Sequence, residues 1–287
     1  MDWIGRIFAG VVLLGCAAAA QAAEIRDGYF RTSDGIQLHY RESGTGPKTL
    51  IFIPGWLMPA EIFDAQLRAL GDSLHVYALS PRSQGRSDLY VGRHTAALRA
   101  RDIHEFVVHA NVPDPVLVGW SLGVMEALDY VHRYRPASLR ALVLIDNSIG
   151  AGRPPRPRPH PQGRGDVETP EMRVAHLTEF VKSMFKTPQA PEFIDIILQS
   201  ALRPPRSVAQ ELLAKPYPRE YYKDVIYQEN IPVWYAITPR FREQGDELMA
   251  HLGKARVTVY PNAGHALFVD AAPQFNADLQ RFLETVY

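Results

Sequence analysis

A single serine between two glycines is the first feature of the sequence that could do chemistry. Ser121 lies in the stretch VGWSLG, directly after the apolar run PVLVGW and directly before a helical pattern. A tight strand-to-helix turn forces strained dihedral angles on such a serine, and the flanking Gly119 and Gly123 remove Cβ clashes. The hydroxyl is then lifted out at the carboxyl end of the strand, so the pattern predicts a nucleophile at Ser121.

A serine hydroxyl is a poor nucleophile until a neighbouring base takes its proton, and histidine commonly serves as that base. His265 lies in the stretch YPNAGHALF, directly after the last strand pattern, where Gly264 permits a tight exit from the strand. The imidazole is therefore expected at the same carboxyl edge of the sheet as Ser121. Six other histidines fall inside expected helices or strands and are interpreted as packing or surface residues: His39, His75, His104, His109, His132 and His251.

An attacking serine also needs donors for the negative charge that develops on the carbonyl oxygen of the substrate. The backbone N–H of Leu122 follows the serine at a helix N-terminus, whose dipole favours negative charge. A second donor is expected from the loop after the apolar run TLIFIP. That loop reads PGWLMP, and the N–H of Trp56 is the natural candidate.

Apolar runs typical of buried strands alternate with helical patterns over most of the chain. The strand patterns are TLIFIP, LHVYALSP, PVLVGW, LRALVLID, PVWYAI and ARVTVYP, and helical patterns lie at residues 60–70, 95–112, 121–134 and 271–287. Asp34 and Gly35 lie between two runs in which apolar and polar residues alternate, so a hairpin is expected before the first of these strand patterns. Strands that alternate with helices imply right-handed crossovers and a parallel sheet covered on both faces.

The alternation stops after Ile145, and from there to about Asn230 the sequence has helical stretches without a clear buried strand. Within this insertion, residues 152–165 are rich in Pro and Arg, which favours an extended loop over a helix. We interpret the charges of this loop as a solvated surface. The insertion separates the earlier strands from the last two.

The composition is that of one large α/β domain or two small ones. The chain has 287 residues, of which 46% are hydrophobic, with 31 basic and 31 acidic side chains. A formal net charge of zero gives no sign of a nucleic-acid surface or an acidic partner. No cluster of His, Asp and Cys has ligand spacing, so we expect neither a metal nor another cofactor.

The N-terminus has the pattern of a secretory signal peptide at residues 1–22. One basic residue, Arg6, precedes the apolar core IFAGVVLLGCAAAA, and AQA places small residues before the expected cleavage site. A non-cleaved anchor is one alternative, although the core is short for a membrane span. A lipoprotein is the other, because LLGC resembles a bacterial lipoprotein box in which Cys16 would be lipidated. We expect the protein in the periplasm or secreted, and at a membrane only if Cys16 carries a lipid.

Together these stretches resemble the α/β-hydrolase superfamily over nearly all of the mature chain. The matching pieces are FIPGW, SPRSQGRSD, VGWSLG and PNAGHALFVDAAPQFNADLQRFL. The resemblance implies an α/β fold with a mostly parallel eight-stranded sheet, helices on both faces and a helical cap inserted after strand six. Residues 23–146 and 231–287 would then form the core, and residues 147–230 the cap. Within the superfamily the chain is most similar to small esterases and cofactor-free haloperoxidases.

Two departures from the superfamily pattern concern loops and not chemistry. Pro54 stands where the oxyanion loop usually has a histidine, and that histidine is mainly a structural support. Ser80 and Ser83 replace an aspartate and a glycine of the second loop, which changes the bonding within that loop.

The third departure concerns the triad acid, which in this superfamily usually follows strand seven. Here that region reads AITPRFREQGDELM, and none of residues 238–241 is acidic. Glu243 and Asp246 come later, on the expected next helix. Asp146 ends strand six, beside the nucleophile strand, at a position where certain haloalkane dehalogenases carry their acid. We therefore assign to Asp146 the task of fixing the imidazole tautomer and stabilising the imidazolium; a capping aspartate is the alternative.

The sequence thus predicts an exported serine hydrolase, carboxylesterase-like, that uses Ser121, His265 and Asp146 and passes through an acyl-enzyme. An apolar acyl or aryl ester would suit the large side chains beside the motifs, each of which could equally be core: Trp56, Leu57, Met58, Trp120 and Phe268. Two alternatives stay open: a perhydrolase or haloperoxidase-like activity of the same triad, and a non-catalytic binding protein on a hydrolase fold. The natural ester and the oligomeric state also stay open.

Overall fold

The computed structural model describes residues 23–154, 169–214, 216–229 and 231–287. The predicted signal peptide at residues 1–22, with Cys16 in it, lies outside these ranges, as does most of the Pro- and Arg-rich loop. Within the described ranges, no helix has both the length and the apolar composition needed to cross a membrane.

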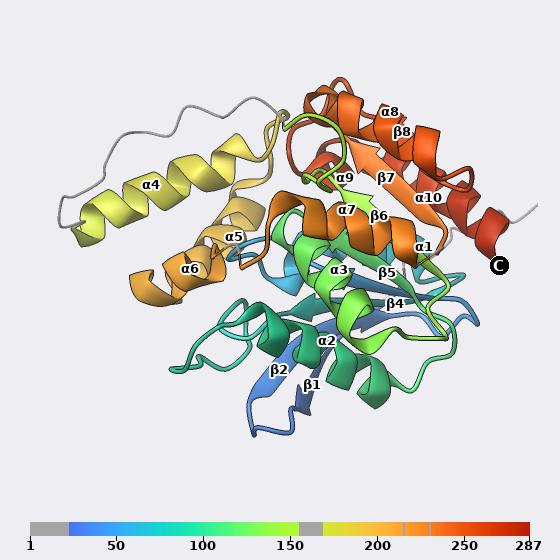
Figure 1. Cartoon of the computed structure of the whole chain (residues 1–287). Helices are drawn as coiled ribbons and strands as arrows, with labels where there is room; N and C mark the ends of the chain where they lie inside the picture. The colour runs from blue at the N-terminus through green and yellow to red at the C-terminus, as the bar shows by residue number, and fades with distance from the viewer. Residues whose placement is uncertain (1–22, 155–168, 215, 230) are drawn as a thin grey trace, which may run out of the picture.

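One sheet of eight strands forms the centre of the molecule (Figure 1). The strand order is β1-β2-β4-β3-β5-β6-β7-β8; β2 pairs antiparallel with both of its neighbours, and all other neighbouring pairs are parallel. The predicted fold class, with its initial hairpin, is therefore confirmed. The strands are β1 (Ile25–Arg31), β2 (Gln37–Ser43), β3 (Thr49–Ile53), β4 (His75–Ser80), β5 (Val116–Trp120), β6 (Ala141–Ile145), β7 (Val233–Ile237) and β8 (Arg256–Val259).

Helices cover both faces of the sheet because successive strand residues point to opposite faces and the central strands are apolar on both. In β3, Leu50 and Phe52 belong to one core cluster, and Ile51 and Ile53 to the other. The first face is covered by α1 (Asp64–Leu70), α9 (Leu267–Asp270) and α10 (Ala272–Val286), with the short 3₁₀ turn η1 (Ala60–Phe63). The second is covered by α2 (Ala96–Ala110), α3 (Leu122–Tyr134), α7 (Arg219–Gln228), α8 (Arg242–His251) and the turn η2 (Pro239–Phe241).

Three helices between β6 and β7 stand off one side of the sheet (Figure 1). They are α4 (Pro170–Ser183), α5 (Pro191–Leu202) and α6 (Arg206–Leu212). Pro170 and Pro191 begin α4 and α5, where a missing N–H costs nothing, and the Thr169 side chain caps α4 by accepting from the N–H of Met172. The next helix, α7, packs instead against α3 on the sheet, so the segment that stands off the sheet ends before α7. We call α4, α5 and α6 the cap helices.

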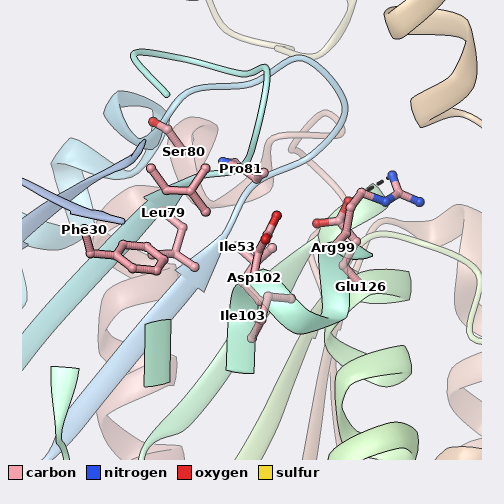
Figure 2. Close-up of a pocket in the computed structure, with 10 residues that line it drawn as sticks. Phe30, Ile53, Leu79, Ser80, Pro81, Arg99, Asp102, Ile103 and Glu126 are labelled. Carbon is pink, nitrogen blue, oxygen red and sulfur yellow. Dashed lines mark ion pairs between the residues drawn. The ribbon is translucent and has the colours of Figure 1, made fainter. Parts of the chain in front are cut away.

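A cluster of buried charges lies on the second face, between the sheet and α2. Arg82, fully buried, makes two hydrogen bonds to Asp102, and Arg99 pairs with Glu126 of α3 at 3.1 Å. A cavity of about 10 Å³ adjoins the cluster. Figure 2 shows Arg99 and Glu126 at one end of this cavity and Phe30 at the other. Burial raises the pKa of the Glu126 carboxyl from 4.5 to about 7, against the opposing effect of the Arg99 cation.

Glu126→Gln should therefore change the pH dependence of stability. Between pH 4.5 and about 7 folded Glu126 keeps a proton that the unfolded chain has lost, so its contribution to the free energy of unfolding falls as pH rises through this window. The free energy of unfolding of the wild type minus that of Glu126→Gln should decline across the window, by at most about 3 kcal/mol. Urea titrations at several pH values measure this difference, and Glu284→Gln, exposed on α10, is the surface control. A difference that rises with pH would contradict the assignment.

Candidate active site

Ser121 occupies a sharp turn between β5 and α3. Its backbone angles are φ 54° and ψ −119°, a conformation that a side chain makes costly. A Cβ at Gly119 would lie 2.5 Å from the carbonyl oxygen of Gly123, and a Cβ at Gly123 would lie 2.3 Å from the carbonyl oxygen of Ile53. Both glycines are thus required by close approach of the backbone. The turn lifts the Ser121 side chain out at the carboxyl edge of the sheet, as the sequence predicts.

Three residues that are distant in the sequence meet at this edge. The hydroxyl oxygen of Ser121 lies 2.9 Å from Nε2 of His265, and Nδ1 of the same ring lies 2.8 Å from Oδ2 of Asp146. The His265 side chain is 16% exposed, whereas that of Asp146 is fully buried. The line of hydrogen bonds therefore runs from a partly open serine to a carboxylate shielded from water. A hydroxyl, an imidazole and a carboxylate linked in this order have the geometry of a serine-activating triad.

The carboxylate of Asp146 is held from the neighbouring strand end. Its Oδ1 accepts hydrogen bonds from the backbone N–H and the hydroxyl of Thr238, each at 2.7 Å. The Asp146 backbone has φ 44°, in the left-handed region, and its N–H donates to the carbonyl of Ala236 in β7. The later acids, Glu243 and Asp246, lie exposed on α8. Of the three carboxylates weighed from the sequence, Asp146 is the one hydrogen-bonded to His265.

The loop that carries His265 is fixed by hydrogen bonds that the sequence analysis did not predict. The indole N–H of Trp120 donates to the His265 carbonyl at 2.9 Å. Oδ2 of Asp270 accepts from the backbone N–H of Gly264 and from that of Lys186, which follows α4. The imidazole is thus positioned both by the core and by the segment between two cap helices.

The two predicted oxyanion donors flank the serine. A Cβ at Gly55 would lie 3.0 Å from Cβ of Ser121, so the loop that carries Trp56 passes directly beside Ser121. Leu122 is the first residue of α3, whose N-terminus attracts negative charge. Within the described ranges, the backbone N–H groups of Trp56 and Leu122 have no hydrogen-bond acceptor. Both are available to a substrate oxygen.

A cavity of about 280 Å³ lies between this loop and the cap helices. Two of the predicted pocket residues, Trp56 and Leu57, line it; Met58, Trp120 and Phe268 are buried in the core cluster of the first face. The cap contributes the rest of the wall, which the sequence analysis did not anticipate: Arg173, His176, Leu177, Phe180, Arg206, Ala209, Gln210 and Leu213. Most of the residues that line the cavity are apolar, and the polar ones all come from the cap helices.

Trp56 belongs both to the cavity wall and to the loop after β3 that passes beside Ser121, although neither Ser121 nor His265 lines the cavity. The indole N–H of Trp56 donates to the carbonyl of Ala209 in α6 at 2.7 Å, and its ring packs edge-on against Phe180 of α4. One residue thereby offers its backbone N–H beside Ser121 and its side chain to the cavity wall.

As for metals, no group of three or more potential ligand side chains gathers within the described ranges.

Comparison with known proteins identifies the family. The profile of the alpha/beta hydrolase family matches residues 50–278, and the chain belongs to this family. The bifunctional esterase/perhydrolase DCH of Acinetobacter calcoaceticus is 33% identical over 120 residues, which are 41% of this chain and 44% of that relative. The chain thus spans less than half of the length of this relative.

Two further similarities extend over more of the chain. The serine hydrolase BPHL of Homo sapiens is 25% identical over 265 residues, covering 88% of this chain and 84% of the relative. The crystal structure of the esterase RhEst1 from Rhodococcus sp. ECU1013 matches with a TM-score of 0.75 at 18% identity, over 91% of this chain and 99% of that one, which shows a common fold. The family is therefore one of hydrolases, with relatives named as esterases and haloperoxidases.

Replacement of Asp146 by Asn separates the catalytic interpretation from the capping one. An amide in place of the carboxylate cannot stabilise an imidazolium, so turnover should fall by about 10³- to 10⁴-fold, as in other triads that lose their acid. Asp246→Asn, on the exposed face of α8, should leave the rate within about twofold of the wild type, since surface substitutions have small effects. Initial rates of hydrolysis of an activated ester measure the turnover of both variants. A large loss in Asp246→Asn and a small loss in Asp146→Asn would instead indicate that the acid lies on α8.

Proposed function

We propose that the protein is an exported serine hydrolase that cleaves a carboxylic ester through Ser121, His265 and Asp146. The observation that carries the proposal is the pair of hydrogen bonds at 2.9 and 2.8 Å that joins these residues at a strained strand-to-helix turn. Membership of a hydrolase family agrees with this assignment.

The reaction has two halves. His265 Nε2 takes the Ser121 proton while the hydroxyl oxygen attacks the ester carbonyl carbon, and the N–H groups of Trp56 and Leu122 bind the resulting oxyanion. The imidazolium, stabilised by Asp146, then gives its proton to the departing alcohol, which leaves an acyl-enzyme. A water molecule that His265 deprotonates attacks the acyl carbon, and the acid departs as Ser121 regains its proton. No other group has to take part.

The cavity beside Trp56 supports an ester with an apolar acyl or aryl part. Its volume of about 280 Å³ is roughly twice that of a cavity that accepts benzene, so a medium-length chain or an aromatic ring system would fit. Aliphatic and aromatic side chains on its wall favour burial of apolar surface.

Export is part of the proposal and rests on residues 1–22 alone, whose pattern is that of a cleaved signal peptide. Lipid anchoring through Cys16 is the alternative route to the envelope. Metabolic labelling with a palmitate analogue distinguishes the two, since only a lipoprotein would incorporate it.

A second activity of the same site is favoured by one comparison, the similarity to a relative named as an esterase/perhydrolase. Hydrogen peroxide would then replace water in the second half, and the acyl-enzyme would release a peracid. Peroxide-dependent bromination in acetate buffer reports that reaction.

Fluorophosphonate labelling tests the nucleophile without knowledge of the natural ester. The wild type should be labelled and should hydrolyse p-nitrophenyl esters, because the probe reacts with an activated serine. Ser121→Ala should be neither labelled nor active, with its melting temperature preserved. Ser148→Ala is a matched control, since the Ser148 hydroxyl bonds to Gln244 and not to His265. An unlabelled wild type would favour the non-catalytic binding protein.

Ala209→Leu tests whether the cavity receives the acyl part. A larger side chain at this buried position of the wall should lower kcat/KM for octanoate esters at least about tenfold and leave acetate esters within about twofold. Ala175→Leu, exposed on α4 and away from the wall, should change neither. A series of p-nitrophenyl esters from acetate to decanoate supplies the data. Equal losses on acetate and octanoate esters would place the acyl group elsewhere.

A further inference from the structure

Thr238 directly follows β7, at the strand end where the superfamily usually carries its acid. It has no carboxylate to offer, yet both of its donors point to one: the backbone N–H and the hydroxyl each lie 2.7 Å from Oδ1 of Asp146. Asp146 is fully buried and Thr238 is 9% exposed. The two residues therefore interact away from water, where a charged hydrogen bond is strong.

This use of the hydroxyl is not explained by the local backbone. Thr238 precedes Pro239, the first residue of the turn η2, where a threonine side chain would ordinarily cap the turn. Its hydroxyl makes no capping bond to η2, and its carbonyl alone accepts the N–H of Phe241. The side chain is directed across to the neighbouring strand end instead.

The two donors leave Asp146 one orientation. An aspartate carboxylate rotates broadly about its Cβ–Cγ bond when nothing holds it. With Oδ1 occupied twice by Thr238, Oδ2 is left to accept from Nδ1 of His265 at 2.8 Å. Since the N–H of Asp146 also donates to Ala236 of β7, the backbone and the side chain of the acid are both tied to strand seven.

We propose that Thr238 is a positioning residue: from the strand-seven position it orients the strand-six acid toward His265. This inference rests on the proposed function, because it assigns to Thr238 an effect on the catalytic base through Asp146. It also accounts for a strand-seven end without an acid, since that end supplies the donors instead of the acceptor.

Thr238→Val tests the inference, since valine keeps the shape and the backbone N–H and removes the hydroxyl alone. The expected result is a loss in kcat of about 10- to 100-fold for p-nitrophenyl ester hydrolysis, the effect of one charge-assisted hydrogen bond, with KM within about twofold. Thr238→Ser keeps the hydroxyl and should restore kcat to within about threefold. A merely structural role would not produce this split or this rescue.

Thr258→Val is the matched control, because the Thr258 hydroxyl accepts from Trp234 on the neighbouring strand and does not contact Asp146. It should leave kcat unchanged. A second readout is the proton shared by Asp146 and His265, which should give a far-downfield NMR signal in the wild type and in Thr238→Ser and lose it in Thr238→Val. If Thr238→Val does not fold, Thr238→Ala carries the same test.

The outcomes separate the two proposals. A wild type that hydrolyses esters, with Thr238→Val retaining more than half of its kcat, would overturn the positioning role and leave the proposed function standing. A wild type that neither hydrolyses esters nor reacts with a fluorophosphonate would overturn both.

Discussion

The backbone at Ser121 is strained, and hydrogen bonds with neighbouring residues hold it in this conformation. A residue with φ 54° and ψ −119° costs about 1–3 kcal/mol and persists only where neighbouring contacts over-determine it. Here the Ser121 N–H donates to the carbonyl of Ile145, and the side-chain amide of Asn147 donates to the Ser121 carbonyl. Gly123 lets α3 approach the backbone of β3 closely. These contacts set the direction of the hydroxyl, on which the approach of His265 depends.

The parallel register carries this constraint from one strand end to the next. Ser121, after β5, bonds to the last carbonyl of β6, and Asp146, after β6, bonds to a carbonyl of β7. Tyr235 of β7 adds a bond from its hydroxyl to the carbonyl of Asn147. Hydrogen bonds therefore link each of these strand ends to the next. As a result Thr238, after β7, and Asp146, after β6, lie close enough to be hydrogen-bonded to each other, and Asp146 also reaches His265, which follows β8.

The parts that could be predicted from the sequence are those with a local signature. Ser121 and His265 stand in short motifs at strand ends, and strand ends can be recognised from apolar runs. The assignment of Asp146 required a further inference: no acid follows strand seven, and the resemblance to the superfamily pointed to the end of strand six as the alternative position. Thr238 carries no local signature, because the bond that matters is made to a residue 92 positions away. The one available signal was the absence of an acid at its position.

Tertiary packing also decided which large side chains border the cavity. Trp120 and Phe268 adjoin the motifs in sequence. However, side chains alternate between the two faces along β5, and α9 packs on the first face, so both residues point into the core of that face. Trp120 then supports the His265 loop through its indole N–H. The cap residues of the wall come from helices whose orientation no periodicity in the sequence specifies. Likewise, α7 reads as one more helix of the insertion, yet its Tyr222, Val225 and Ile226 pack into the core of the second face.

The cap is attached to the site at two separate loops. Trp56, in the loop after β3, donates to the carbonyl of Ala209 in α6, whereas Ala266, beside His265, donates to the carbonyl of Met184 after α4. Asp270 adds bonds to the backbone N–H groups of Lys186 and Thr187. Because the loops of Trp56 and of His265 are each bonded to the cap, a shift of the cap helices would move both loops relative to the Ser121 turn. The helices that shape the cavity are thus hydrogen-bonded to the two loops that the proposed mechanism requires to be aligned with Ser121.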